Sequence, residues 1–255
     1  MKHHRSNADS FQLGLQSAGH RISAKVVAFS ARVVVVVVCT LALTAVAVLL
    51  SPTAPADGKV VLGGGAGIVV AGSYCTLTAI GHDDTGNLVG FTAGHCGGPG
   101  SEVSAEGSPG TLGTVVAIDD DLDYGVIKFD PAKVNPTADF DGFAINGMGP
   151  DPQWRQPVCT LGAATGNYCS VIITMPVPGP ARTMPAPYQA GDDGRPVTAD
   201  DLLIGLTHRS FILPPASLFD YPIPETKVIL FSAIFDDIAA KGGGPGAGFN
   251  PVPRT

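Results

Sequence analysis

The segment Phe91-Thr92-Ala93-Gly94-His95-Cys96 carries the strongest local signal in this chain. It follows an apolar run that begins at Leu88, so a buried strand leads into a turn that presents an imidazole. Elsewhere, short apolar runs rich in Val, Ile and Thr alternate with Gly, Pro and Asp clusters, and the chain contains 33 Gly and 22 Pro. This pattern predicts an all-β barrel or sandwich.

Strands and one helix can be placed from these runs and the turns between them. The strands are expected at Gly67–Val70, Cys75–Ile80, Leu88–Thr92, Gly113–Ile118, Gly125–Phe129, Pro157–Leu161, Ser170–Thr174, Leu202–Thr207 and Lys227–Phe231. The helix is expected near the end of the chain, with Ser232 as its N-cap and Gly242 as its stop.

An apolar run of 18 residues, Val33–Leu50, predicts a transmembrane or signal-anchor helix. Basic residues before it, Arg32 among them, place residues 1–32 in the cytoplasm and the rest outside. The sequence Ala54-Pro55-Ala56 fits signal-peptidase cleavage after Ala56, whereas the long polar leader favours a retained anchor. Localisation is therefore predicted to be the cell envelope, either anchored in the membrane or secreted after cleavage.

Five regions follow from these assignments. They are a cytoplasmic leader (1–32), the apolar helix (33–50), a Pro/Gly-rich linker (51–66), a globular domain (67–240) and a Gly/Pro tail (241–255). The tail is predicted to be disordered, because its composition cannot form a core.

The charge distribution argues against a nucleic-acid partner. Five of the 15 Lys and Arg residues and one of the 22 acidic residues lie in residues 1–56, which leaves residues 57–255 with a net charge of −11. Nucleic-acid binding needs a basic surface, so no such partner is expected. No motif indicates a cofactor.

Four cysteines follow the apolar run: Cys75, Cys96, Cys159 and Cys169. An even number in an oxidising compartment predicts disulfides, and three connectivities are open. Their spacings contain no close C-x₂-C pair, so a zinc site is not expected. Cys39 lies inside the apolar run and is interpreted as a small buried hydrophobe.

Three segments together resemble the chymotrypsin-like serine proteases, in particular the secreted bacterial branch of streptogrisin and α-lytic protease. They are Phe91–Cys96, the acidic segment Asp121–Ile127, and Val158–Cys169. The resemblance covers roughly residues 70–240. It implies two six-stranded Greek-key β-barrels with a C-terminal helix, preceded here by the N-terminal helix.

The resemblance also assigns roles to residues. It makes His95 the catalytic base and Asp123, which lies 28 residues further on, the carboxylate that orients it. It pairs Cys75 with Cys96, and Cys159 with Cys169 across a hairpin.

The segment that matches the family's nucleophile motif departs from it at a decisive position. The family has Gly-Asp-Ser-Gly-Gly-Pro, and this chain has Gly191-Asp192-Asp193-Gly194-Arg195-Pro196. Asp193 therefore stands where the serine is expected, and the oxyanion-hole donors would be the N–H groups of Gly191 and Asp193. A carboxylate is a poor nucleophile toward an amide, and its charge opposes a developing oxyanion.

Two further departures agree with the first. Arg195 takes the place of the second glycine, and His208-Arg209-Ser210 follows a strand where the family has small residues. We expect the side chains of the segment His208-Arg209-Ser210 to crowd the cleft, unless they are ordinary loop residues. The sequence thus predicts a non-catalytic protease homologue that binds a peptide or protein in the relic cleft. A weakly active hydrolase using His95 and Asp123, and a purely structural envelope protein, are the rival interpretations.

Overall fold

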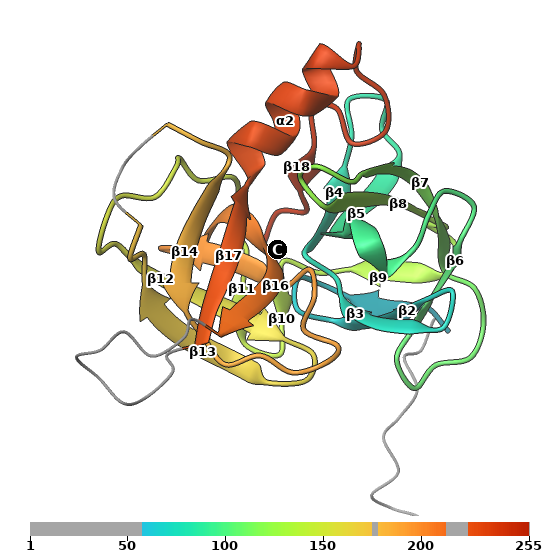
Figure 1. Cartoon of the computed structure of the whole chain (residues 1–255). Coiled ribbons are helices and arrows are strands. Elements are labelled where there is room, and N and C mark those ends of the chain that lie inside the picture. Colours follow the sequence, from blue (N-terminus) through green and yellow to red (C-terminus); the bar gives the residue numbers. More distant parts are fainter. Residues whose placement is uncertain (1–57, 175–177, 213–223, 255) are drawn as a thin grey trace, which may run out of the picture. The chain divides into compact units, whose positions relative to one another are not determined.

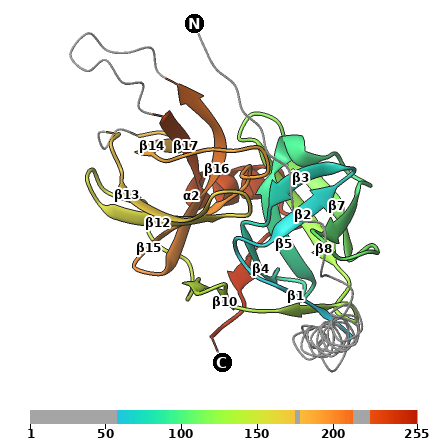
Figure 2. The same cartoon turned by 90° about the horizontal axis from the view of Figure 1, so that it is seen from below.

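A computed structural model describes residues 58–174, 178–212 and 224–254. The described chain is built almost entirely of β-strands, with one short 3₁₀ helix and one α-helix. Two curled sheets lie beside each other, and the α-helix covers one end of the space between them (Figure 1). The view turned by 90° shows the same division into two groups of strands (Figure 2). The predicted all-β, two-barrel architecture is confirmed.

The first sheet has the strand order β18-β4-β5-β8-β7-β6-β2-β3. All of its neighbouring strands are antiparallel. The strand bounds are β2 Gly67–Val70, β3 Ser73–Thr76, β4 Ala79–His82, β5 Leu88–Ala93, β6 Glu102–Ala105, β7 Gly113–Asp119, β8 Tyr124–Phe129 and β18 Asn250–Pro251. With eight strands, this sheet is larger than the six-stranded barrel expected.

The second sheet has six strands in the order β13-β12-β15-β16-β17-β14, again antiparallel. Their bounds are β12 Pro157–Gly162, β13 Gly166–Val171, β14 Ala181–Pro185, β15 Pro196–Ala199, β16 Leu202–Ile212 and β17 Pro224–Leu230. Two small pairs complete the strands: β1 (Val60–Leu62) with β9 (Val134–Pro136), and β10 (Asp139–Phe140) with β11 (Phe143–Ala144).

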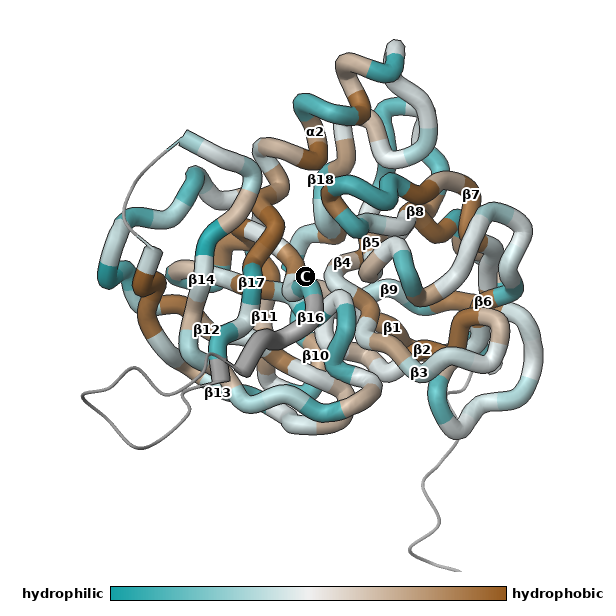
Figure 3. Tube along the Cα trace, in the orientation of Figure 1, coloured by the Kyte–Doolittle hydropathy of each residue, from teal (hydrophilic) through white to brown (hydrophobic). Residues whose placement is uncertain are grey.

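Apolar side chains form a core inside each curled sheet, and a further apolar cluster lies between the two sheets. Every residue of β5 is buried, as is typical of a strand covered on both faces. The helix α2 (Phe231–Ala240) packs its Phe231 edge-to-face against Phe91 of β5, with ring centroids 5.2 Å apart. Figure 3 shows this concentration of hydrophobic residues along the strands. The helix therefore fastens the second sheet to the strand that leads into His95.

The Gly/Pro tail is ordered, so the prediction of disorder over 241–255 is wrong for its described part. Phe249 is buried and packs edge-to-face against Phe91, and β18 pairs with β4. The five glycines Gly242, Gly243, Gly244, Gly246 and Gly248 all have positive φ, so they turn the chain sharply back toward the core. The composition was taken to exclude a core, but Phe249 joins the core and anchors the segment.

The ordered domain begins before residue 67, because β1 falls inside the segment interpreted as a linker. The predicted strand Cys75–Ile80 is two strands, β3 and β4, separated at Leu77 and Thr78. Helix α2 begins at Phe231, and Ser232 is not its N-cap. The hydroxyl of Ser232 instead donates to Asp151.

The predicted apolar helix at 33–50 lies outside the described residues. Among the residues that the structure describes, no helix is long and apolar enough to cross a bilayer.

Candidate functional site

His95 lies in the short 3₁₀ helix η1 (Gly94–Cys96), directly after β5. This turn packs closely against the loop that carries Asp123: a Cβ on Gly94 would lie 3.0 Å from the carbonyl oxygens of Asp119 and Tyr124. The N–H of Gly94 donates to the carbonyl of Asp123. The glycine of the Thr-Ala-Gly-His-Cys string is therefore what allows the imidazole and the carboxylate to approach each other.

Asp123 holds the imidazole of His95 from its Nδ1 side. One carboxylate oxygen lies 2.8 Å from Nδ1, and the other accepts the backbone N–H of His95 at 2.8 Å. Asp123 has a positive φ of 55°, a conformation that Asp tolerates better than most residues. The loop before β8 thus turns the side chain back onto η1.

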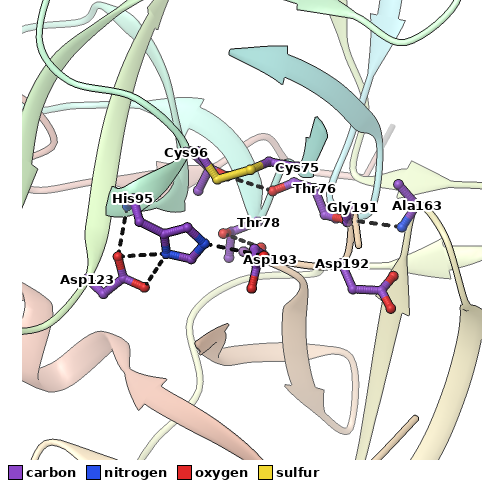
Figure 4. Close-up of a disulfide and its surroundings, with 12 residues drawn as sticks. Cys75, Thr76, Thr78, His95, Cys96, Asp123, Ala163, Gly191, Asp192 and Asp193 are labelled. Atoms are coloured by element: carbon purple, nitrogen blue, oxygen red, sulfur yellow. Dashed lines mark hydrogen bonds and ion pairs between the residues drawn. A yellow bond between two sulfur atoms is a disulfide. The ribbon is translucent and has the colours of Figure 1, made fainter. Parts of the chain in front are cut away.

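Asp193 faces the opposite side of the same ring. Its Oδ2 lies 3.3 Å from Nε2 of His95 and accepts the hydroxyl of Tyr188 at 2.7 Å. The backbone carbonyl of Asp193 accepts the N–H of Thr76 in β3, which anchors this loop of the second sheet on the first. Figure 4 shows the resulting row: Asp123, the imidazole of His95, and Asp193.

The absence of a side chain at Gly194 allows the Asp193 loop to approach the first sheet closely. Its φ is +85°, and a Cβ there would lie 2.6 Å from the hydroxyl oxygen of Thr92 and 2.7 Å from the backbone N of Ala93. The carbonyl of Gly194 also accepts the hydroxyl of Thr78 at 2.6 Å. Gly194, which matches the glycine after the serine in the family motif, is therefore needed for this contact between the sheets.

His95 is held as an imidazolium. Both ring nitrogens face carboxylate oxygens, which can only accept, so both nitrogens must carry protons. The hydrogen bonds to Asp123 and then to Asp193 raise the pKa of His95 from 6.5 to about 10, against the opposing effect of burial. An imidazole in this state has no free lone pair with which to take up a proton.

The two carboxylates remain ionised. Burial acts to raise the pKa of Asp123, but the hydrogen bonds from His208 and His95 outweigh burial and hold the pKa below its ordinary value of 3.8. For Asp193, burial is likewise outweighed by the hydrogen bonds from His95 and Tyr188, so its pKa is also lowered. The row is therefore an anion, a cation and an anion at neutral pH.

His208 is a fourth member of this row, and sequence reasoning missed its contact with Asp123. Its Nδ1 donates to Oδ2 of Asp123, and its ring lies edge-on to His95 with ring centroids 6.2 Å apart. The contact could not be read from the sequence, because β16 and the Asp123 loop are 85 residues apart. The side chains of Arg209 and Ser210 lie outside the described residues.

A metal ion has one conceivable set of ligands among the described residues. Donor atoms of His95, Asp123 and His208 all lie within 4.8 Å of one another. The carboxylate of Asp123 already accepts hydrogen bonds from both imidazoles, so these three residues satisfy each other without an ion.

Asp192 and Arg195 form a fully buried ion pair beside the site. Both side chains are 0 % exposed, and the closest nitrogen–oxygen separation is 3.8 Å. The Asp192 carboxylate also accepts the backbone N–H groups of Ala164, Thr165 and Gln189. Arg195, which stands where the family has its second glycine, therefore points into the protein and pairs with Asp192.

The backbone N–H groups of Gly191 and Asp193 are the predicted oxyanion-hole donors. Within the described part of the chain, neither donates a hydrogen bond to a protein acceptor. The loop is fixed by the carbonyl of Gly191, which accepts the hydroxyl of Thr76 at 2.7 Å, and by the positive φ of Gly191, 103°. The loop therefore carries two backbone donors without a protein acceptor, one of them the N–H of Asp193 itself.

Both predicted disulfides are present. Cys75 is bonded to Cys96, which ties β3 to the turn of His95. Cys159 is bonded to Cys169, and these two residues are direct cross-strand partners in the β12–β13 hairpin. The first bond therefore braces the imidazole, whereas the second lies in the hairpin whose turn, at Ala164 and Thr165, contacts Asp192.

Comparison with solved structures identifies the fold. Thermobifida fusca protease A superposes with a TM-score of 0.56 at 18% identity, over 77% of this chain and 100% of that chain. Cellulomonas bogoriensis chymotrypsin gives 0.53 at 19% identity, over 77% and 100%. An α-lytic protease homologue, N4, gives 0.54 at 22% identity, over 72% and 98%. The chain thus has the chymotrypsin-like serine-protease fold. No family model matches the sequence, and no curated protein does.

The raised pKa of His95 makes stability pH-dependent in a defined direction. The folded state binds this proton more tightly than the unfolded state, so the stabilisation is complete below pH 6.5 and is lost as the pH rises through about 10. We expect the melting temperature of the wild type to fall across this window more steeply than that of His95→Gln. His82→Gln, at an exposed histidine on β4, is the matched control. Parallel curves for the wild type and His95→Gln would contradict the assignment.

Proposed function

We propose that this chain is an exported, non-catalytic protease homologue that binds an extended peptide segment beside His95. The observation that carries the proposal is the position of Asp193. Its carboxylate lies against Nε2 of His95, where the family's mechanism needs a hydroxyl whose proton the imidazole can accept. A serine nucleophile is thereby replaced by an acid, and the base is already protonated.

The electrostatics of the row oppose acyl transfer in two ways. An imidazolium with a pKa of about 10 is almost fully protonated at neutral pH, which removes the general base. The same short loop carries the charge of Asp193 and the two unpaired N–H groups at which an oxyanion would have to form, so that charge opposes the oxyanion. A neutral carbonyl carries less negative charge than an oxyanion, so binding a peptide is compatible with the same arrangement.

A binding role makes use of what the site retains. The N–H groups of Gly191 and Asp193 can donate to a peptide carbonyl, and Gly191 lines a pocket of about 310 Å³. The buried pair of Asp192 and Arg195 keeps the loop in this conformation. The proteins of similar structure are named proteases, and a protease fold is built to present such donors to peptides.

Export is part of the proposal. Two disulfides persist in oxidising compartments and are rare in the cytosol. The apolar run at 33–50 and the basic residues before it supply a targeting signal of the expected kind.

Peptide retention tests this function. The full chain, purified with its disulfides intact and immobilised, is incubated with a synthetic mixture of ten-residue peptides, and bound and free fractions are quantified by mass spectrometry. We expect retained peptides to remain uncleaved. Ala190→Trp should abolish retention, because this exposed residue adjoins Gly191 and the indole would cover its N–H. Ala132→Trp, at an exposed alanine in the turn between β8 and β9, is the matched control and should bind normally.

Two outcomes would overturn the proposal. Equal and negligible retention by the wild type and Ala190→Trp would show that this surface binds no peptide. Fragments that accumulate with the wild type but not with His95→Ala would show that the chain is the hydrolase of the rival interpretation.

A further inference from the structure

A pocket beside Gly191 combines apolar walls with one acidic side chain, and this combination favours some ligands over others. It has a volume of about 310 Å³ and lies where β3 meets the β12–β13 turn. Three alanines, Ala163, Ala164 and Ala190, line it together with Tyr74, whose side chain is exposed. Small apolar walls and an exposed aromatic ring favour an aliphatic chain that can lie flat against them.

Among the described residues that line the pocket, Glu106 is the only charged one. A Cβ built on Gly67 would lie 2.4 Å from Oε2 of Glu106 and 3.3 Å from Cβ of Ala163, so the carboxylate lies over Gly67 beside the alanine wall. The glycine is what leaves room for it. In the described part of the chain, no Lys, Arg or His nitrogen lies within ion-pair distance of Glu106.

These features fit one class of side chain. A long basic side chain places its methylene groups on apolar walls and its cation at a polar end, as lysine and arginine do on protein surfaces. The cation would meet the carboxylate of Glu106 and the face of Tyr74. An apolar side chain would shield Glu106 from water without a partner, and an acidic one would be repelled. The net charge of −11 over residues 57–255 adds long-range attraction for cationic peptides.

We propose that this acidic side pocket, formed by Tyr74, Glu106 and the three alanines, binds a Lys or Arg side chain of the bound peptide. The inference rests on the proposed peptide-binding function and names the residue class that the peptide must carry. Because Gly191 belongs to both the pocket and the donor pair, the basic residue lies close in sequence to the carbonyl that the N–H groups bind.

A positional peptide library tests the inference. Fluorescent ten-residue peptides with one fixed residue (Lys, Arg, Leu or Glu at each position in turn, all others mixed) are titrated onto the full chain by fluorescence anisotropy. We expect Lys or Arg at a single position to bind about fivefold more tightly than Leu, the size of one partly exposed ion pair with a cation–π contact. Glu106→Gln should remove this preference, and Glu106→Lys should shift it to Glu.

Glu102→Gln is the matched control, since Glu102 is an exposed acid at the start of β6, the strand that directly precedes Glu106, and it lines a different pocket. It should leave the preference unchanged. Tight binding with no preference for Lys or Arg, or a preference that survives Glu106→Gln, would overturn the inference and leave the binding function intact. Absence of binding by every library would overturn both.

Discussion

Arg195→Met is expected to lower the free energy of unfolding by roughly 3–5 kcal/mol, the cost of leaving a buried charge without its partner. Asp192 and Arg195 are both 0 % exposed, so water cannot replace the lost guanidinium. Arg195 also donates from Nη1 to the carbonyl of Pro187 and the hydroxyl of Thr165, and these bonds would be lost as well. Equilibrium unfolding in urea, followed by fluorescence, measures the change.

The double variant Asp192→Asn/Arg195→Met separates charge from packing. It should be more stable than Arg195→Met alone, because no net charge is then left buried. A single variant within about 1 kcal/mol of the wild type, a size typical of exposed ion pairs, would contradict the account of this pair.

The second large effect is expected in labelling by a fluorophosphonate probe, which reacts with activated serine hydroxyls. The wild type is expected to show no labelling and no turnover of peptide esters, because Asp193 offers no hydroxyl and His95 no lone pair. Asp193→Ser removes one of the two carboxylates that raise the pKa of His95 and places a hydroxyl near Nε2. We expect Asp193→Ser to be labelled at least about 10²-fold faster than Asp193→Ser/His95→Ala, the lower range for general-base catalysis.

His95→Ala in the Asp193→Ser background is the control and should abolish the gained labelling. Robust labelling of the wild type that is lost in His95→Ala would show that the site is catalytic as it stands. Arg195 must be kept in all these variants, since it neutralises Asp192 and does not obstruct the cleft.

Much of the fold could be predicted because its strongest signals are local. An apolar strand followed by Thr-Ala-Gly-His-Cys specifies β5 and η1, and both disulfides join the cysteines that the family resemblance pairs. The strands that were missed are short or contain several polar residues, as β14 and β15 do. These strands join the sheet by pairing with strands distant in sequence, and the hydrophobic periodicity of a segment does not reveal such partners.

In the candidate site, too, the contacts between residues distant in sequence could be predicted only where a local motif identified each residue. The row of His95, Asp123 and Asp193 could be placed by analogy, because each residue stands in a segment with its own pattern. His208 could not, since its partner lies 85 residues away. Arg195 could be noted only as a departure from a glycine, and its pairing with Asp192 depends on how the loop folds. Phe249 was missed because a single aromatic residue in a Gly/Pro segment gives no periodic signal.

The pKa of His95 is the most direct test of the central claim that this imidazole is held as a cation between two carboxylates. It can be measured by NMR titration of the histidine ring signals, with His95 assigned from the signals absent in His95→Gln. The account predicts that His95 titrates near pH 10 in the wild type and at lower pH in Asp193→Asn. Titration of wild-type His95 near the ordinary value of 6.5, unchanged in Asp193→Asn, would contradict it.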